Sequence, residues 1–173
     1  MSIGQSMLSE FDHEMASTRK VLERIPEDKL DFKPDPKSMA LGRLAGHIAE
    51  MPGWGAVVLT TDSLDLNPPG AKSSYEALVA TSRAQVLAAF DKMAADSRAA
   101  LSSVTDEAMM KNWQLLMGGN VMMEMPRVAM IRTMVMNHTI HHRAQMTVYF
   151  RLTGVPVPGM YGPSADEGMA AAG

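Results

Sequence analysis

Apolar residues recur every three or four positions along four stretches of the chain, which is the spacing of amphipathic helices. The pattern predicts helices over residues 5–25, 38–60, 73–102 and 127–152. Pro52 and Gly53 interrupt the second stretch, so we expect a kink or a break in that helix. Gly154, followed closely by two prolines, is expected to end the fourth helix.

The segments between these helices contain the prolines and glycines that favour loops. Residues 26–37 and 62–72 are predicted to be loops of this kind. The longer segment 106–126 has two short apolar runs on either side of Gly118-Gly119-Asn120, a sequence that suits the turn of a short hairpin. Connections of this length are uncommon unless they serve a site or cross from one end of a fold to the other.

Four amphipathic helices without a convincing sheet predict an all-α protein, specifically a four-helix bundle. The length of 173 residues fits one domain, and no change of composition marks a second one. We place the bundle domain at residues 1–163 and expect residues 164–173, which are rich in small side chains, to form a flexible C-terminal tail. Most of the 18 methionines are expected to fill gaps in the core, because their side chains are flexible.

Composition and charge remove several classes of function. The chain has no cysteine, which excludes disulfides, cysteine zinc ligands and cysteine nucleophiles. The 16 basic and 19 acidic residues give a net charge of −3, so no basic excess is available for phosphates and nucleic-acid binding is not expected. The first basic residue is Arg19, and no run approaches the roughly 18 apolar residues of a membrane span, so we expect a cytoplasmic protein without a membrane segment.

Polar side chains interrupt the apolar stripe of the fourth predicted helix. At about 100° per residue, His138, His142 and Gln145 fall on the same side of this helix as its apolar residues. A buried imidazole or amide without a partner costs about 1–3 kcal/mol. We therefore expect something in the core to satisfy these three side chains.

A metal ion would satisfy two of them, because His138 and His142 lie one helical turn apart on the same face. The glutamate of the metalloprotease motif is absent between them, so this is not that motif. A third ligand is expected from a facing helix, and His47 stands in the core line of the second helix. Taken singly, each is best explained as a structural histidine bonded to a backbone carbonyl; taken together, the three favour a metal site.

Four further residues are candidates for supporting that site. Gln145 is placed to bind a substrate or a metal-bound water, and Tyr149, His141 and Glu50 are candidates for contacting the ligands. Each of them also has a plainer alternative. Gln145 could be a core amide, Tyr149 a core aromatic, His141 a contact to a partner subunit and Glu50 a surface carboxylate. Arg143 points away from the stripe and is expected to form a structural ion pair.

The run Asn137-His138-Thr139-Ile140-His141-His142-Arg143-Ala144-Gln145, with His47 inside the segment 44–50, resembles the DinB family of metal-dependent proteins. The resemblance covers nearly the whole chain, including the closing segment 155–164. The family usually has glycine where Ala144 stands, which leaves the ligands untouched.

The resemblance implies a four-helix bundle of up-down-down-up order with a long crossover, for which segments 62–72 and 106–126 are the candidates. It also implies a metal triad of His47, His138 and His142, and a homodimer.

Several relatives transfer small thiols, so the resemblance implies a thiol S-transferase or thiol-dependent isomerase acting on a small-molecule substrate. Its cofactors would be a divalent ion (Zn, Ni, Fe or Mn) and a low-molecular-weight thiol. Two alternatives stay open: a metal-dependent hydrolase, since the same site would activate water, and a non-catalytic bundle of the damage-inducible class that binds a small molecule or partner.

Overall fold

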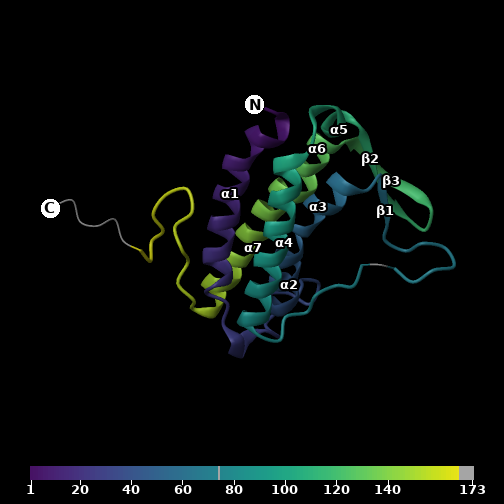
Figure 1. Ribbon diagram of the computed structural model, residues 1–173. Coiled ribbons are helices and arrows are strands. Elements are labelled where there is room, and N and C mark those ends of the chain that lie inside the picture. The colour runs from purple at the N-terminus through teal and green to yellow at the C-terminus, as the bar shows by residue number, and fades with distance from the viewer. Residues whose placement is uncertain (74, 168–173) are drawn as a thin grey trace.

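The computed structural model describes residues 1–73 and 75–167, and it is built mainly from helices (Figure 1). In chain order the helical elements are α1 (Ile3–Leu22), the 3-10 turn η1 (Glu27–Lys29), α2 (Leu41–Glu50), α3 (Gly53–Thr60), α4 (Arg83–Ser103), α5 (Asp106–Met110), α6 (Arg127–Met130), the π-helical segment η2 (Ile131–Asn137) and α7 (His138–Thr153). The described residues contain no helix that is both long enough and apolar enough to cross a membrane.

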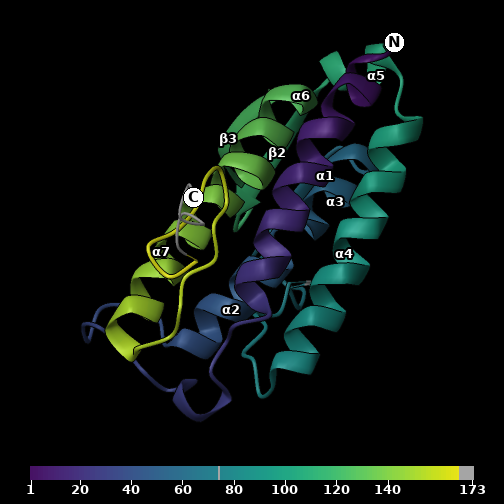
Figure 2. The ribbon, with the colours of Figure 1, turned by 90° about the vertical axis from the view of Figure 1, so that its left-hand side faces the viewer.

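The long helical segments lie side by side (Figures 1 and 2). The first, α1, runs in the same direction as the rod formed by α6, η2 and α7, whereas α2–α3 and α4 run the opposite way. Because α3 and α4 run in the same direction, residues 61–82 have to cross from one end of the bundle to the other. The first of the two candidate loops is therefore part of this crossover segment.

Local sequence explains where several helices begin and end. The hydroxyl of Ser2 accepts a hydrogen bond from the backbone of Gln5 and starts α1, and Ser82 starts α4 in the same way. The predicted break at Pro52 is present, because it separates α2 from α3. As expected, α7 ends at Gly154, whose left-handed backbone (φ 74°) favours glycine.

Two predicted helices begin later in the chain than their apolar spacing suggested. The second begins at Leu41 and not at residue 38, and the third begins at Arg83 and not at residue 73. The segment before Arg83 has helical spacing, but its backbone bonds to α2 instead: the Ala80 N–H donates to the Gly42 carbonyl over 3.1 Å. This tertiary contact replaces the first turns of the predicted helix.

The all-α prediction is wrong in one respect, because the chain also forms a small sheet. Its strands, in the order in which they pair, are β1 (Ser63–Asp65), β2 (Asn112–Met117) and β3 (Asn120–Pro126). The antiparallel hairpin of β2 and β3 turns at Gly118 and Gly119, as their sequence predicts. Parallel pairing of β1 with β2 was missed, since three residues are too few for a periodic pattern.

Arg143 forms the expected structural ion pair, and it does so in the interior. Its guanidinium lies 2.7 Å from the carboxylate of Glu14 on α1, and both side chains are almost completely buried. Tyr161, which follows α7, donates its hydroxyl to the same carboxylate over 2.9 Å. Because breaking a buried ion pair is costly, this contact ties α7 and the segment after it to α1.

The segment after α7 is attached to the bundle at two further points. Arg151 pairs with Asp166 over 2.6 Å, and Arg24 pairs with Glu167 over 2.9 Å. Residues 168–173, the end of the expected flexible tail, lie outside the described residues. The proposed domain boundary at residue 163 stays a prediction.

Gly46 is required where α2 meets the crossover, because a Cβ atom there would stand 2.0 Å from the carbonyl oxygen of Leu78. We expect Gly46→Ala to lower the free energy of unfolding by about 1–3 kcal/mol in urea titrations, although alanine normally favours a helix by about 1 kcal/mol. In the control Gly53→Ala, the nearest atoms belong to the flexible side chain of Met93, so the loss should be smaller. Equal losses in both variants would contradict this account.

Candidate metal centre

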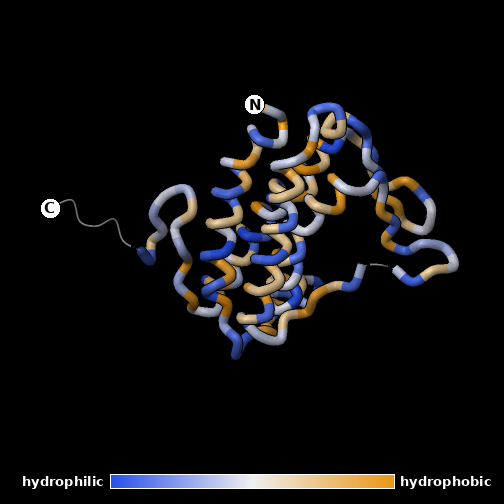
Figure 3. The backbone as a smooth tube through the Cα atoms, viewed as in Figure 1, coloured by the Kyte–Doolittle hydropathy of each residue, from blue (hydrophilic) through white to orange (hydrophobic). Residues whose placement is uncertain are grey.

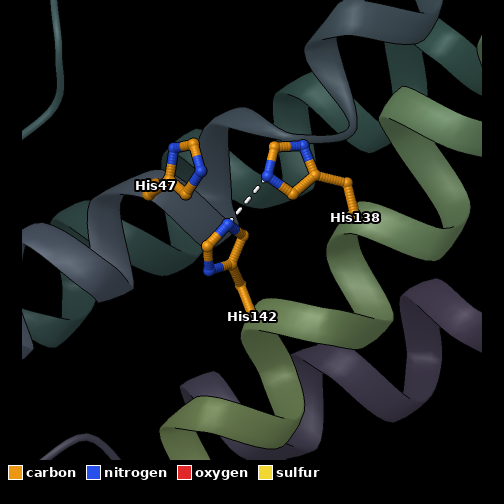
Figure 4. A group of neighbouring side chains, drawn as sticks. All are labelled: His47, His138 and His142. Atoms are coloured by element: carbon orange, nitrogen blue, oxygen red, sulfur yellow. Dashed lines mark hydrogen bonds between the residues drawn. The ribbon is translucent and has the colours of Figure 1, made fainter.

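The contact between α2 and α7 brings three histidines together, as their positions in the sequence predict (Figure 4). His47 comes from α2, whereas His138 and His142 come from the first turns of α7. The potential ligand atoms of the three imidazoles all lie within 4.8 Å of one another. His142 is buried and the other two side chains are half-buried.

The protonation of His142 follows from its neighbours. Its Nδ1 lies 2.7 Å from the Oε1 atom of Gln145, and its Nε2 lies 2.7 Å from Nε2 of His138. Since an amide oxygen only accepts hydrogen bonds, Nδ1 of His142 carries the proton. Its Nε2 therefore presents a lone pair toward the centre of the cluster, which is the arrangement that a metal ligand needs.

His138 stands directly after the π-helical segment η2. Such segments are rare and occur frequently at functional sites. Nε2 of His138 faces Nε2 of His142 over 2.7 Å, so the residue that follows η2 directly contributes to the cluster.

The π-helical segment also explains why the predicted face of the last helix is partly wrong. The prediction placed Gln145 and Leu152 in the apolar stripe, but both are exposed, whereas Arg143 and Met146 are buried. A π-helix has more residues per turn than an α-helix, so η2 rotates the face of α7 relative to the residues that precede η2. A constant angle of about 100° per residue therefore assigns the wrong face to some residues of α7. Gln145 nevertheless reaches back to His142 from its exposed position.

Electrostatics keeps His138 and His142 neutral at pH 7. Burial lowers the pKa of His142 to about 4, and the neighbouring imidazoles act in the same direction. Burial and the charges that His47 and His141 would carry also lower the pKa of His138. A neutral imidazole is the form that binds a metal ion, so the cluster is ready to do so without losing protons.

Glu50 is buried, so the alternative that it is a surface carboxylate is wrong. One of its oxygens lies 3.7 Å from Nδ1 of His47, and it accepts hydrogen bonds from Arg43 (3.2 Å), Tyr75 (3.1 Å) and the Leu78 N–H. Burial alone would raise the pKa of the Glu50 carboxyl, but the nearby imidazole and the three donors outweigh it and hold the pKa below its usual value. This carboxylate therefore stays charged beside His47.

The remaining candidates lie close to the cluster in different ways. Tyr149 is a core aromatic, as its plainer alternative proposed, and its hydroxyl donates to the carbonyl of Met39 over 3.0 Å. His141 is exposed, and its ring centre lies 4.8 Å from that of His142. Neither side chain belongs to the group of converging nitrogen atoms.

A cavity of about 420 Å³ opens beside His142. Its wall includes His142, Gln145 and Tyr149 from α7, and Lys37, Ser38 and Met39 from the loop before α2. This loop carries an ammonium group and a hydroxyl, so the cavity offers polar contacts to a small molecule that approaches the histidine cluster.

Comparison with known proteins identifies the family. The model of the DinB family matches residues 1–170 of the chain. The protein belongs to the DinB family. The sequence is 28% identical over 162 residues to the uncharacterized protein YrdA of Bacillus subtilis, and the match covers 92% of this chain and 89% of YrdA.

Solved DinB structures have the same fold. A DinB-like protein from Bacillus cereus is 28% identical, with a TM-score of 0.67 and coverage of 92% of this chain and 98% of that one. A DinB-like protein from Bacillus subtilis is 19% identical, with a TM-score of 0.62. This match covers 87% of the present chain and 96% of the Bacillus subtilis chain.

The residues present fit a divalent metal ion. Three imidazoles converge, Gln145 fixes the orientation of His142, and Nδ1 of His47 is a buried nitrogen without a hydrogen-bond partner that faces Glu50. A small shift of either side chain would close the 3.7 Å gap. Carboxylates that hold the far nitrogen of a metal-binding histidine are common in metalloproteins.

The lowered pKa of His142 predicts how the metal-free protein responds to acid. The imidazole has a pKa of about 4 in the fold and about 6.5 in the unfolded chain. Between these values the unfolded chain binds the extra proton, so the free energy of unfolding should fall as the pH drops from 6.5 toward 4. Urea titrations with a chelator present, at pH 7, 6 and 5, measure this dependence.

The variant His142→Gln should show a flatter pH dependence than the unchanged protein. The matched control is His13→Gln, because His13 is exposed on α1 and lies outside the cluster. Its pH dependence should equal that of the unchanged protein. If His142→Gln keeps the full dependence, the neutral state of this imidazole is wrongly assigned.

Proposed function

We propose that this DinB protein is a metal-dependent enzyme that joins a low-molecular-weight thiol to an electrophilic carbon. The observation that carries the proposal is the convergence of three imidazoles beside a cavity of about 420 Å³. His47, His138 and His142 would hold a divalent ion (Zn, Ni, Fe or Mn). The thiol as co-substrate follows from the resemblance to relatives that transfer small thiols.

The donor set suits this chemistry. Three neutral imidazoles would leave a bound divalent ion its full charge and an open position, and such an ion would supply the positive charge that lowers the pKa of a thiol. The thiolate is the nucleophilic form of sulfur. As the new carbon–sulfur bond forms, an epoxide would lose a carbon–oxygen bond or an activated alkene its π bond, and the released oxygen or carbon would take up the proton that the thiol lost. An aryl halide would instead release halide, and the proton would go to solvent.

The chain's own side chains have separate tasks in this proposal. Gln145 holds the proton of His142 on Nδ1, and Glu50 orients His47. Lys37 and Ser38 offer an ammonium group and a hydroxyl to the polar groups of a substrate in the cavity. The Tyr149 hydroxyl donates a hydrogen bond to the carbonyl of Met39 and so holds the ring in the cavity wall.

Metal content tests the first half of the proposal. Elemental analysis of untagged protein should find about one divalent ion per chain. Replacing one of three ligands leaves too few for firm binding, so His138→Ala should weaken metal affinity at least about tenfold. The control His13→Ala should keep the content of the unchanged protein, and equal metal content in His138→Ala would count against the shared site.

Thiol consumption tests the second half. Metal-loaded protein is incubated with cysteine or glutathione and a panel of an epoxide, an aryl halide and an activated alkene. We expect the thiol to disappear in equal amounts with one of these electrophiles, and His138→Ala to lower kcat/KM at least about a hundredfold. Hydrolysis of an ester without any thiol would instead assign the site to the hydrolase alternative. The homodimer, the cytoplasmic location and induction by damage stay predictions.

A further inference from the structure

A second cavity, of about 760 Å³, lies between α3, α4 and the crossover. Trp54 and Val57 of α3, Ala89 and Met93 of α4, and Leu78 and Val79 of the crossover form much of its wall. Figure 3 shows that the crossover is hydrophobic where it approaches α4. Cavities of roughly 300–1,000 Å³ with mostly apolar walls are typical binding sites for small molecules.

This cavity is separate from the metal centre, although the two share one residue. Glu50 forms part of the cavity wall, and its carboxylate also faces His47. None of the three converging histidines is among the residues that line the larger cavity. A molecule in this cavity would therefore contact the residues that support the metal centre, not the centre itself.

Aromatic side chains give the cavity a preference for flat molecules. The rings of Trp54 and Tyr75 both line it, and their centres lie 5.8 Å apart at an interplanar angle of 57°. The thioether of Met93 lies in the same wall. Aromatic rings and thioethers both make favourable contacts with an aromatic ligand.

The charges in the wall disfavour an anion. Glu50, Glu76 and Asp96 line the cavity together with one cation, Lys92. Lys92 pairs with Asp96 over 2.6 Å, and Arg43, which lies outside the wall, pairs with Glu50 over 3.2 Å. Among the described residues of the wall, this leaves Glu76 as the carboxylate without a salt bridge. A negatively charged ligand would be repelled here. The cavity beside His142 has the opposite character, since its charged wall residue is Lys37.

We propose that the larger cavity binds a flat aromatic molecule that carries no negative charge, at a site that does not require a metal ion. The matched probes are N-phenyl-1-naphthylamine, which is neutral, and its sulfonate, 1-anilinonaphthalene-8-sulfonate. Both become fluorescent in apolar surroundings. We expect the neutral probe to bind the full-length protein about tenfold more tightly than the anionic probe.

Two pairs of variants locate the binding site. Ala89→Phe fills the cavity and should weaken binding of the neutral probe at least about tenfold, whereas Ala88→Phe, next to it but on the exposed face of α4, should not. Glu76→Lys should tighten binding of the sulfonate about fivefold. The control is Glu107→Lys, at an exposed position of α5. Glu76 is exposed as well, so neither substitution disturbs the core.

The result should not depend on the metal centre. His138→Ala should bind the neutral probe as the unchanged protein does, so failure of the proposed enzyme function and failure of this proposal are distinguishable. The proposal would be overturned if Ala89→Phe and Ala88→Phe bound the neutral probe with equal affinity. It would also be overturned if Glu76→Lys left the affinity for the sulfonate unchanged. Absence of probe binding, with a dimer that Ala89→Phe dissociates, would also overturn it and assign the cavity to an interface between two copies.

Discussion

The contact between α2 and α7 is the constraint on which the rest of the structure depends, because it brings three buried or half-buried imidazoles together. Polar groups at such a contact are costly unless something satisfies them. The fold fixes the proton of one ring, that of His142, from outside the cluster through Gln145. At the centre, Nε2 of His142 lies 2.7 Å from Nε2 of His138, and the potential ligand atoms of all three rings lie within 4.8 Å of one another.

The crossover gives this centre its support on the side of α2. Its backbone passes so close to α2 that only a glycine fits at position 46, and this approach lets the Leu78 N–H reach Glu50. Tyr75 and Arg43 hold the same carboxylate. A buried charge with several donors keeps one orientation, and here that orientation faces His47. The segment that connects two helices therefore also positions the carboxylate that faces His47.

The sequence was sufficient to predict the four long helical stretches, the break at Pro52, the hairpin and the meeting of the three histidines, because each depends on local spacing or on residue chemistry. The sequence was not sufficient where contacts between residues far apart in the chain determine the local structure. The helix expected from residue 73 begins at Arg83, since the crossover bonds to α2 instead. The exposure of Gln145 was missed because a π-helical segment shifts the helix face, and no periodic signal marks such a segment.

The most direct measurement of the central claim is X-ray absorption spectroscopy at the metal edge of zinc-loaded protein. Zinc is suitable because its bonds to histidine nitrogen have a narrow range of about 2.0–2.1 Å. The account predicts three imidazole ligands at that distance, completed by an oxygen ligand from solvent or a sulfur ligand from substrate. A spectrum with fewer than three imidazoles, or one dominated by carboxylate oxygen, would contradict it.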